Sequence, residues 1–179
     1  MLILVMSRER RLIMFAVNDV VMYTTYGICK ISNIIEMSFG GNTNKYYVLH
    51  PLRESKTELT LPVDNPMTKI RLHPLLPENE INDLIHEIPF LEVYWIEKDN
   101  DRKAKFGDIV KSGDRKETLR LIKCIKYHAV DIKDKGRKLH ATDETAMKDA
   151  EKLILDEFSY VLNMERDKLQ IILNTELEK

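Results

Sequence analysis

The fold is decided by the stretch Phe15-Ala-Val-Asn-Asp-Val-Val-Met-Tyr-Thr-Thr-Tyr-Gly-Ile-Cys-Lys-Ile31. Its polar pair Asn18-Asp19 predicts a turn. The apolar run from Val20 to Tyr23 predicts a short strand, because β-branched and aromatic residues fit a half-buried pleated surface. Gly27 predicts a break with positive φ, and a second strand starts at Ile28. Two short strands around such a break are typical of the start of a small antiparallel barrel.

Three more strands are predicted downstream, separated by turn-forming residues. The second strand continues to about Met37 and ends in a Gly/Asn cluster that can close a hairpin. The further strands are expected at 45–50, 57–62 and 69–72, and Pro62 ends the fourth because proline lacks a backbone donor. Five strands of this length predict an SH3-like or Tudor-like antiparallel β-barrel over residues 14–73.

The second part of the chain is predicted to be helical, without any strand signal after Glu92. Pro77 followed by acids predicts a helix start, Gly113-Asp114 a helix end and a new cap, and Thr142 the cap of a long helix. Apolar residues at helical spacing mark three buried stripes: Ile81, Leu84, Ile85 and Ile88; Leu121, Ile122, Ile125 and Ala129; Met147, Ala150, Ile154, Phe158 and Val161. The predicted fold class is α+β, a small barrel followed by an all-α helical bundle over residues 74–179.

Charge is divided unevenly along the 179 residues, whose formal net charge is −1. Residues 95–140 hold 14 Lys+Arg against 8 Asp+Glu, whereas residues 141–179 hold 5 against 10. The basic charge is therefore confined to one segment, which is where an acidic partner such as nucleic acid would bind.

Composition excludes several classes of protein. With 44% hydrophobic and 32% charged residues the chain is typical of soluble globular proteins and too apolar for disorder. No apolar run is long enough to span a membrane. The two cysteines, Cys29 and Cys124, are expected to be buried reduced thiols, and without a secretion signal the chain is expected to be cytoplasmic. Met14 is the expected natural start, which makes residues 1–13 a non-native or disordered extension.

No motif for an enzyme is present. The five histidines are scattered without ligand spacing, and the two cysteines form no CxxC, so a metal site is not expected. Neither the G-x-x-x-x-G-K-[ST] nor the G-x-G-x-x-G phosphate loop occurs. We therefore predict no catalytic activity, no cofactor and no small-molecule substrate.

A set of short motifs resembles one family. These are the opening pattern F-x-V-x-D-x-V-x-Y-x-x-x-G-I-x-x-I from Phe15, then Tyr46-Tyr47-Val-Leu, Leu61-Pro62-Val, Ile70-Arg71-Leu, Trp95, Ser112-Gly113-Asp114 and Asp149-Ala150-Glu151. In this order they resemble the CarD/CdnL family of bacterial transcription regulators, whose barrel is shared with the RNA-polymerase-interacting module of transcription-repair coupling factors. The resemblance covers the chain from Phe15 to about Leu162.

The resemblance implies two partners and no chemistry. The barrel is expected to bind the β subunit of RNA polymerase, with Ile35, Met37 and Thr60 at the contact, and a free sheet edge can also accept a strand from a partner. The positions matching the family's basic contact residues fall near Met37 and Thr60, and neither is basic. The helical part is expected to contact promoter DNA, largely without sequence preference, at the upstream edge of the melted region and so to stabilise the open complex.

Trp95 is the main candidate for that DNA contact. The matching tryptophan in the family wedges into the minor groove, which costs least beside DNA that is already unstacked. The cations Lys98, Arg102, Lys103 and Lys105 follow and can hold phosphates, and a second cationic stripe is predicted at Lys116, Arg120 and Lys123. Two alternatives remain open. Trp95 can pack in the core while the charges form a solvated face, or the helical part can dock another protein without touching DNA.

Overall fold

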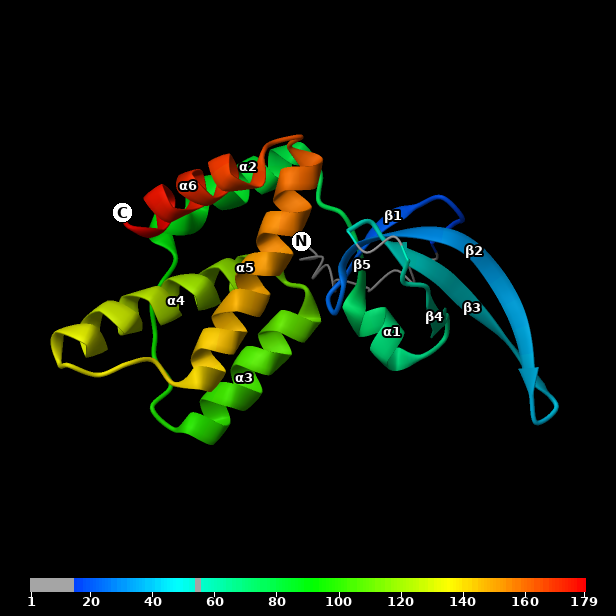
Figure 1. The fold of residues 1–179 in the computed structure, drawn as a ribbon, viewed down its shortest axis with the longest axis horizontal. Helices are drawn as coiled ribbons and strands as arrows, with labels where there is room; N and C mark the ends of the chain where they lie inside the picture. Colours follow the sequence, from blue (N-terminus) through cyan, green and yellow to red (C-terminus); the bar gives the residue numbers. More distant parts are fainter. Residues whose placement is uncertain (1–14, 54–55) are drawn as a thin grey trace, which may run out of the picture.

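A computed structural model describes residues 15–53 and 56–179. Figure 1 shows a curved sheet on one side and a group of helices on the other, which confirms the predicted α+β class. The expected extension at residues 1–13 lies outside the described residues.

The sheet has five antiparallel strands, as predicted. They are β1 (Val20–Tyr23), β2 (Gly27–Phe39), β3 (Asn42–Pro51), β4 (Leu59–Pro62) and β5 (Leu72–Pro74), in the spatial order β4-β3-β2-β1-β5. A bulge between Ile31 and Asn33 shifts the β2–β3 register. Gly27 has φ +84° and so turns the chain from β1 into β2, as expected.

The predicted strand at 69–72 is wrong in its position. Residues 66–71 form the short helix α1 (Pro66–Arg71), and the fifth strand starts only at Leu72. The Asn65 side chain accepts a hydrogen bond from the backbone N–H of Met67 at 2.7 Å, and Pro66 occupies the first turn. Asparagine before proline is therefore a helix start here, with the local capping bond favouring helix over strand.

The two faces of β1 and β2 pack against different parts of the molecule, because successive side chains of a strand alternate. Val21, Tyr23, Cys29 and Ile31 lie in the core of the sheet, together with Tyr47, Leu49 and Leu72. On the opposite face Met22 and Ile28 pack against Leu153 of the helical part. Cys29 and Cys124 are both free and buried, as predicted.

The helical part consists of α2 (Glu78–Glu87), the 3₁₀ turn η1 (Ile88–Phe90), α3 (Asp99–Ser112), α4 (Arg115–Asp134), α5 (Ala141–Val161) and α6 (Arg166–Leu177). The three predicted apolar stripes point inward and form one core with α6. Gly113 ends α3 in the left-handed conformation, and the Asp114 side chain accepts from the Glu117 N–H, as their sequence predicts. The predicted cap at Thr142 is wrong: the cap of α5 is His140, two residues earlier, and Thr142 lies in the first turn of the helix.

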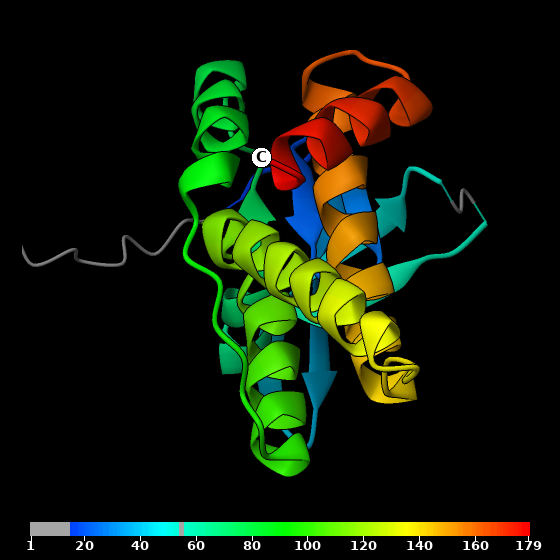
Figure 2. The same ribbon diagram turned by 90° about the vertical axis from the view of Figure 1, so that its left-hand side faces the viewer.

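Residues 91–98 are not helical, in contrast to the prediction (Figure 2). Their backbone groups are satisfied by side chains of the helices. The Tyr94 N–H donates to the Cys124 sulfur, and the carbonyl oxygens of Ile96 and Glu97 accept from the Arg102 guanidinium at 2.7 and 3.2 Å. These tertiary bonds replace the helical ones, so the segment can stay extended.

A buried ion pair joins the sheet to the helices. Glu157 of α5 is 1% exposed and accepts two bonds from Arg115, both at 2.8 Å, and a third from the Leu76 N–H at 2.9 Å. Arg115 also donates to the carbonyl oxygens of Pro74 and Gly113. One carboxylate therefore connects the end of β5, the α3–α4 turn and the C-terminal part of α5.

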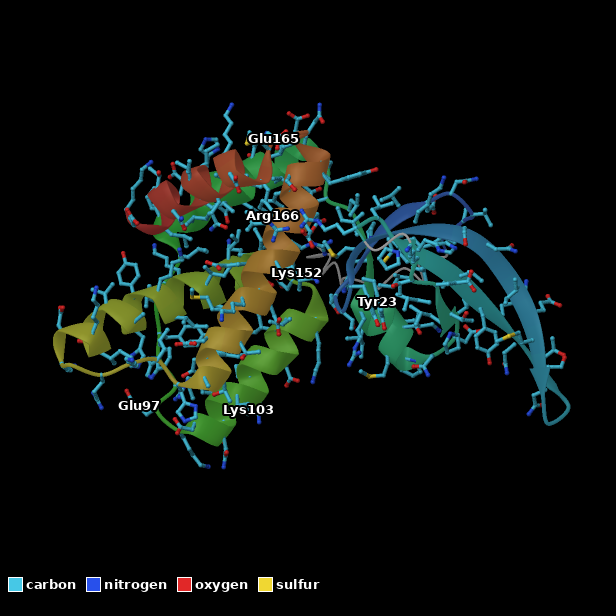
Figure 3. All side chains as sticks on the ribbon, viewed as in Figure 1. Tyr23, Glu97, Lys103, Lys152, Glu165 and Arg166 are labelled. Carbon is cyan, nitrogen blue, oxygen red and sulfur yellow. The ribbon has the colours of Figure 1, made fainter. Side chains whose placement is uncertain are left out.

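The neighbouring carboxylate, Asp156, makes a second connection. It pairs with Arg53 after β3 at 3.2 Å and with Arg166 at the start of α6. Arg166 is labelled in Figure 3. A Cβ added at Gly27 would lie 2.8 Å from an Asp156 carboxylate oxygen, so glycine is required both for its φ and for this close approach.

We expect Arg115→Met to destabilise the fold by about 3–5 kcal/mol, because it leaves the buried Glu157 carboxylate without its charge partner. Urea unfolding of the whole chain measures this loss. Lys116→Met is the matched control: Lys116 pairs with Glu87 at 2.6 Å with both side chains about half exposed, and such pairs contribute under about 1 kcal/mol. Equal losses in the two variants would contradict the role assigned to Arg115.

The stability of this junction is expected to depend on pH through His73 of β5. Burial, and next the charge of Arg115, lower the pKa of His73 from its ordinary 6.5, while Glu157 acts in the opposite direction. The unfolded chain therefore binds a proton at His73 more readily than the folded one. The free energy of unfolding should fall as the pH decreases below about 6.5, the ordinary pKa of a histidine.

Urea unfolding between pH 7.5 and 5.5 measures this slope, with pH values chosen around the ordinary pKa of about 6.5. We expect a shallower slope for His73→Gln than for the parent. His86→Gln removes an exposed histidine and should leave the parent slope unchanged. An unaltered slope in His73→Gln would show that other groups carry the pH dependence.

Candidate functional sites

The strand register places the three predicted polymerase-contact residues on one face of the sheet. Ile35 is opposite Tyr46, Met37 is opposite Asn44, and Thr60 is opposite Val48. Directly opposed residues share a face, and Tyr46 and Val48 are two apart on β3. Ile35 and Met37 are half-buried and Thr60 is exposed. We call Ile35, Met37, Tyr46 and Thr60 the outer sheet face.

This outer sheet face points away from the sheet's own core, which is on the side of Tyr47 and Leu49. The β2–β3 hairpin extends beyond the helices, and Figure 1 shows its far end clear of them. At one edge of the sheet, β4 pairs with β3 alone among the described strands. The arrangement thus offers a partner both a side-chain surface and a strand edge.

The comparison with known families agrees with this geometry. Residues 15–73 match the CarD-like/TRCF RID domain. The N-terminal region is a CarD-like/TRCF RID domain. The matched segment starts at the quoted stretch and ends within β5, so it includes the outer sheet face and the β4 edge. An RID domain implies interaction with RNA polymerase, and regulators of this kind are non-enzymatic. A search of curated proteins with the same chain found no match.

Outside the RID domain, Trp95 lies in the extended segment before α3 and is half-buried. Its ring stacks on His128 with centroids 3.5 Å apart and planes 11° from parallel, and it meets Phe106 edge-to-face at 6.0 Å. The Arg102 guanidinium lies over the ring at 4.7 Å. The structure therefore uses Trp95 for packing, and insertion into DNA would require the ring to leave the His128 stack.

Arg102 is buried, although it was predicted as a phosphate contact. It is 4% exposed, and its guanidinium makes two 3.0 Å bonds to Asp143 and one of 2.7 Å to Asp99. The hydrogen bonds that Arg102 donates to Asp143, and in smaller measure to Asp99, raise its pKa. The Arg102 guanidinium therefore faces the interior, where it binds Asp143 of α5. The two residues are 41 apart in the sequence.

Lys123 is also buried, so the prediction of a cationic stripe opposite the apolar one is wrong at this position. Lys123 is only 3% exposed, like a core residue. Its ammonium group donates hydrogen bonds to the carbonyl oxygens of Ile88 and Pro89 at 2.9 and 2.7 Å. Burial lowers its pKa. Lys123 caps the C-terminal end of η1, whereas Lys116 and Arg120 pair with Glu87 and Glu117.

The remaining predicted cations are exposed but divide between two sides of α3. Lys98, at the helix cap, and Lys105 are seven residues apart and so lie on the same side. Lys98 pairs with Asp101 at 3.3 Å. Lys103 lies on a different side and lines a groove between α3 and α5 (Figure 3).

A basic loop completes the cationic surface near Trp95. Arg137 and Lys138, between α4 and α5, line a pocket of about 280 Å³ with Trp95 and His128. Both are exposed, and no carboxylate among the described residues pairs with either. The charge excess of residues 95–140 was the sequence signal for this loop, but only the fold brings it beside Trp95.

An exposed apolar surface in the helical part had no signal in the sequence. It consists of Phe90, Val93, Tyr94, Tyr127 and Val130. Phe90 is 85% and Val130 64% exposed. Residues 89–94 and α4 are held together here by Lys123, whose ammonium binds the Pro89 carbonyl and lies 5.8 Å from the Tyr127 ring centre. We call these five residues the aromatic surface.

Within residues 15–53 and 56–179 no group of three or more His, Cys, Asp or Glu side chains is placed to hold a metal ion. In the same ranges no helix has the length and apolar composition needed to cross a membrane.

Proposed function

We propose that this chain is a bacterial transcription regulator. Its RID domain binds the β subunit of RNA polymerase, and its helical part contacts promoter DNA at the upstream edge of the bubble and stabilises the open complex. The observation that carries the proposal is the RID match over residues 15–73. The strand register supports it, because Ile35, Met37 and Thr60 share one face of the sheet, where Thr60 is exposed and the other two are half-buried.

Polymerase binding is supported by both features of the outer sheet face. A strand of the partner can pair with the free side of β4, which needs main-chain groups and little side-chain identity. Ile35, Met37 and Tyr46 then supply apolar contact beside that edge. Because Met37 and Thr60 are uncharged, the contact in this chain depends on apolar burial more than on ion pairs.

Ile35→Glu tests this contact. It places a charge on the outer sheet face, and we expect binding to purified polymerase to weaken at least about tenfold, or 1.4 kcal/mol. Titration of labelled chain with polymerase measures the change, and thermal unfolding checks that the hairpin is intact. Glu36→Ala, on the opposite side of the same strand, should bind as the parent does.

Thr60→Arg supplies an independent variant at the β4 edge. It restores a cation at a position where related proteins carry one, so binding should strengthen at low salt if the facing polymerase surface is acidic. If neither Ile35→Glu nor Thr60→Arg changes the affinity, the outer sheet face is not the polymerase contact.

DNA contact is supported by the exposed cations near Trp95. Lys98 and Lys105 of α3 and Arg137 and Lys138 of the basic loop can bind phosphates without reading sequence, which suits a factor acting at many promoters. Trp95 shares a pocket with Arg137 and Lys138, which the acids Glu97, Asp99 and Asp143 also line. Its stack with His128 makes a wedge role a separate proposal from phosphate binding. Arg102 and Lys123 are left out because their charges are buried.

The salt dependence of DNA binding tests the basic loop. In the complex of chain, polymerase and promoter, we replace Arg137 and Lys138 of the loop, and Lys133 in the last turn of α4, with Gln. This should shorten the open-complex lifetime and make its salt dependence shallower by about 0.9 per lost phosphate contact. The control replaces Lys148, Lys152 and Lys168, exposed residues of α5 and α6, with Gln and removes the same charge. Equal effects of the two triple variants would argue against a DNA contact at the loop.

A protein-binding adaptor is the second candidate, and the aromatic surface favours it. Side chains as exposed as Phe90 and Val130 are typical of protein contacts when they lie together. In that case the helical part would dock a protein, and its binding would change little between low and moderate salt, because an apolar contact is hardly screened.

A further inference from the structure

We propose that the groove between the RID domain and the helical part binds a small anionic molecule with an apolar body. This goes beyond the proposed function and does not depend on it. The groove holds about 560 Å³ and is lined by the β1–β2 turn, the end of α1, α3 and α5. Its volume is in the range of ordinary small-molecule sites, which is about 300–1,000 Å³.

The floor of the groove is apolar. Its apolar lining includes Phe106 and Val110 of α3 and Ala141 and Ala146 of α5. Phe106 is buried at 2% exposure and also supports Trp95, so this wall is part of the helical core. A flat or aliphatic body can therefore be buried against a surface that is already rigid.

The rim of the groove is cationic. Arg71, Lys103 and Lys111 line it with one acid, Asp149. None of the three cations forms an ion pair with a carboxylate in the part of the chain that the structure describes. The Arg71 Nε is enclosed without a hydrogen-bond partner, and its Nη1 has only a 3.4 Å bond to the Thr25 hydroxyl. An unpaired guanidinium beside two ammonium groups selects a carboxylate, sulfonate or phosphate.

Gly107 keeps the groove open. It lies in the middle of α3, where glycine costs about 1 kcal/mol relative to alanine. A Cβ added there would meet no atom within 4 Å, and its φ is not in the left-handed region, so neither packing nor backbone geometry requires glycine. The missing side chain leaves room in which a bound molecule can approach the helix backbone closely.

A ligand in this groove would contact both parts of the molecule at once. Thr24 and Arg71 belong to the RID domain, whereas Lys103 and Thr145 belong to α3 and α5. Because the ligand binds only when the two parts are docked, it should stabilise the docked state. The bound molecule would lie between the RID domain and the helical part, and the proposal does not involve any chemical reaction of this molecule.

The fluorescent sulfonate 8-anilinonaphthalene-1-sulfonate is the probe, since it combines an anion with an aromatic body. The neutral N-phenyl-1-naphthylamine has the same body without the sulfonate. We expect the parent chain to bind one sulfonate probe with at least tenfold preference over the neutral one. Amide shifts in a ¹⁵N-labelled sample should map to Gly107, Thr24 and Thr145. Equal affinity for both probes would overturn the requirement for an anion.

Variants of α3 locate the site. Gly107→Leu fills the groove and Lys103→Glu reverses a rim charge, so each should weaken the sulfonate probe at least tenfold. Lys105→Glu reverses a charge on the other side of α3, so this control should bind as the parent does. Circular dichroism checks the fold of each variant. Unchanged binding in Gly107→Leu, or amide shifts confined to the aromatic surface, would overturn the proposal, whatever the result with polymerase.

Discussion

The arrangement of this molecule depends on one buried ion pair, Arg115 with Glu157. Moving two charges out of water costs several kcal/mol for each ion, so the pair can exist only if the geometry is satisfied completely. Here Glu157 accepts both bidentate bonds and the Leu76 N–H, while Arg115 reaches two backbone carbonyl oxygens. Any other arrangement of the sheet on the helices would leave hydrogen-bonding groups of this buried pair without partners, and is therefore disfavoured.

Helix α5 is the element that both parts share. Leu153 contacts the sheet through Met22 and Ile28, and Asp156 pairs with both Arg53 and Arg166. On its other turns Ile154 and Phe158 lie in the helical core. Because α5 has two buried faces and two buried carboxylates, and because packed interiors deform little, it holds the sheet and the helical core in a fixed relative position. In the proposed function, α5 would therefore set the distance between the polymerase contact on the sheet and the DNA contact in the helical part.

The candidate sites show how far charge along a sequence can be interpreted. The outer sheet face was accessible to prediction, because strand alternation and a known family pattern both apply to Ile35, Met37 and Thr60. The cations of the helical part differ in their exposure, because some are buried and some are solvated, although in the sequence they form one basic segment. Arg102 is paired with the Asp143 carboxylate, and Lys123 donates hydrogen bonds to two backbone carbonyl oxygens; in both cases the partners come from distant elements. A charge count cannot distinguish a buried cation with its partners from a solvated one.

The sequence alone determined the local elements: the strands around Gly27, the helix stripes, the Gly113 and Asp114 caps, and the RID identity of residues 15–73. These depend on periodicity and on backbone preferences that act within a few residues. Only the tertiary structure decided that residues 91–98 stay extended, that Trp95 stacks on His128, and that an open groove lies beside Gly107. Each of these results from groups that are far apart in the chain, and their free energy appears only when packing brings them together.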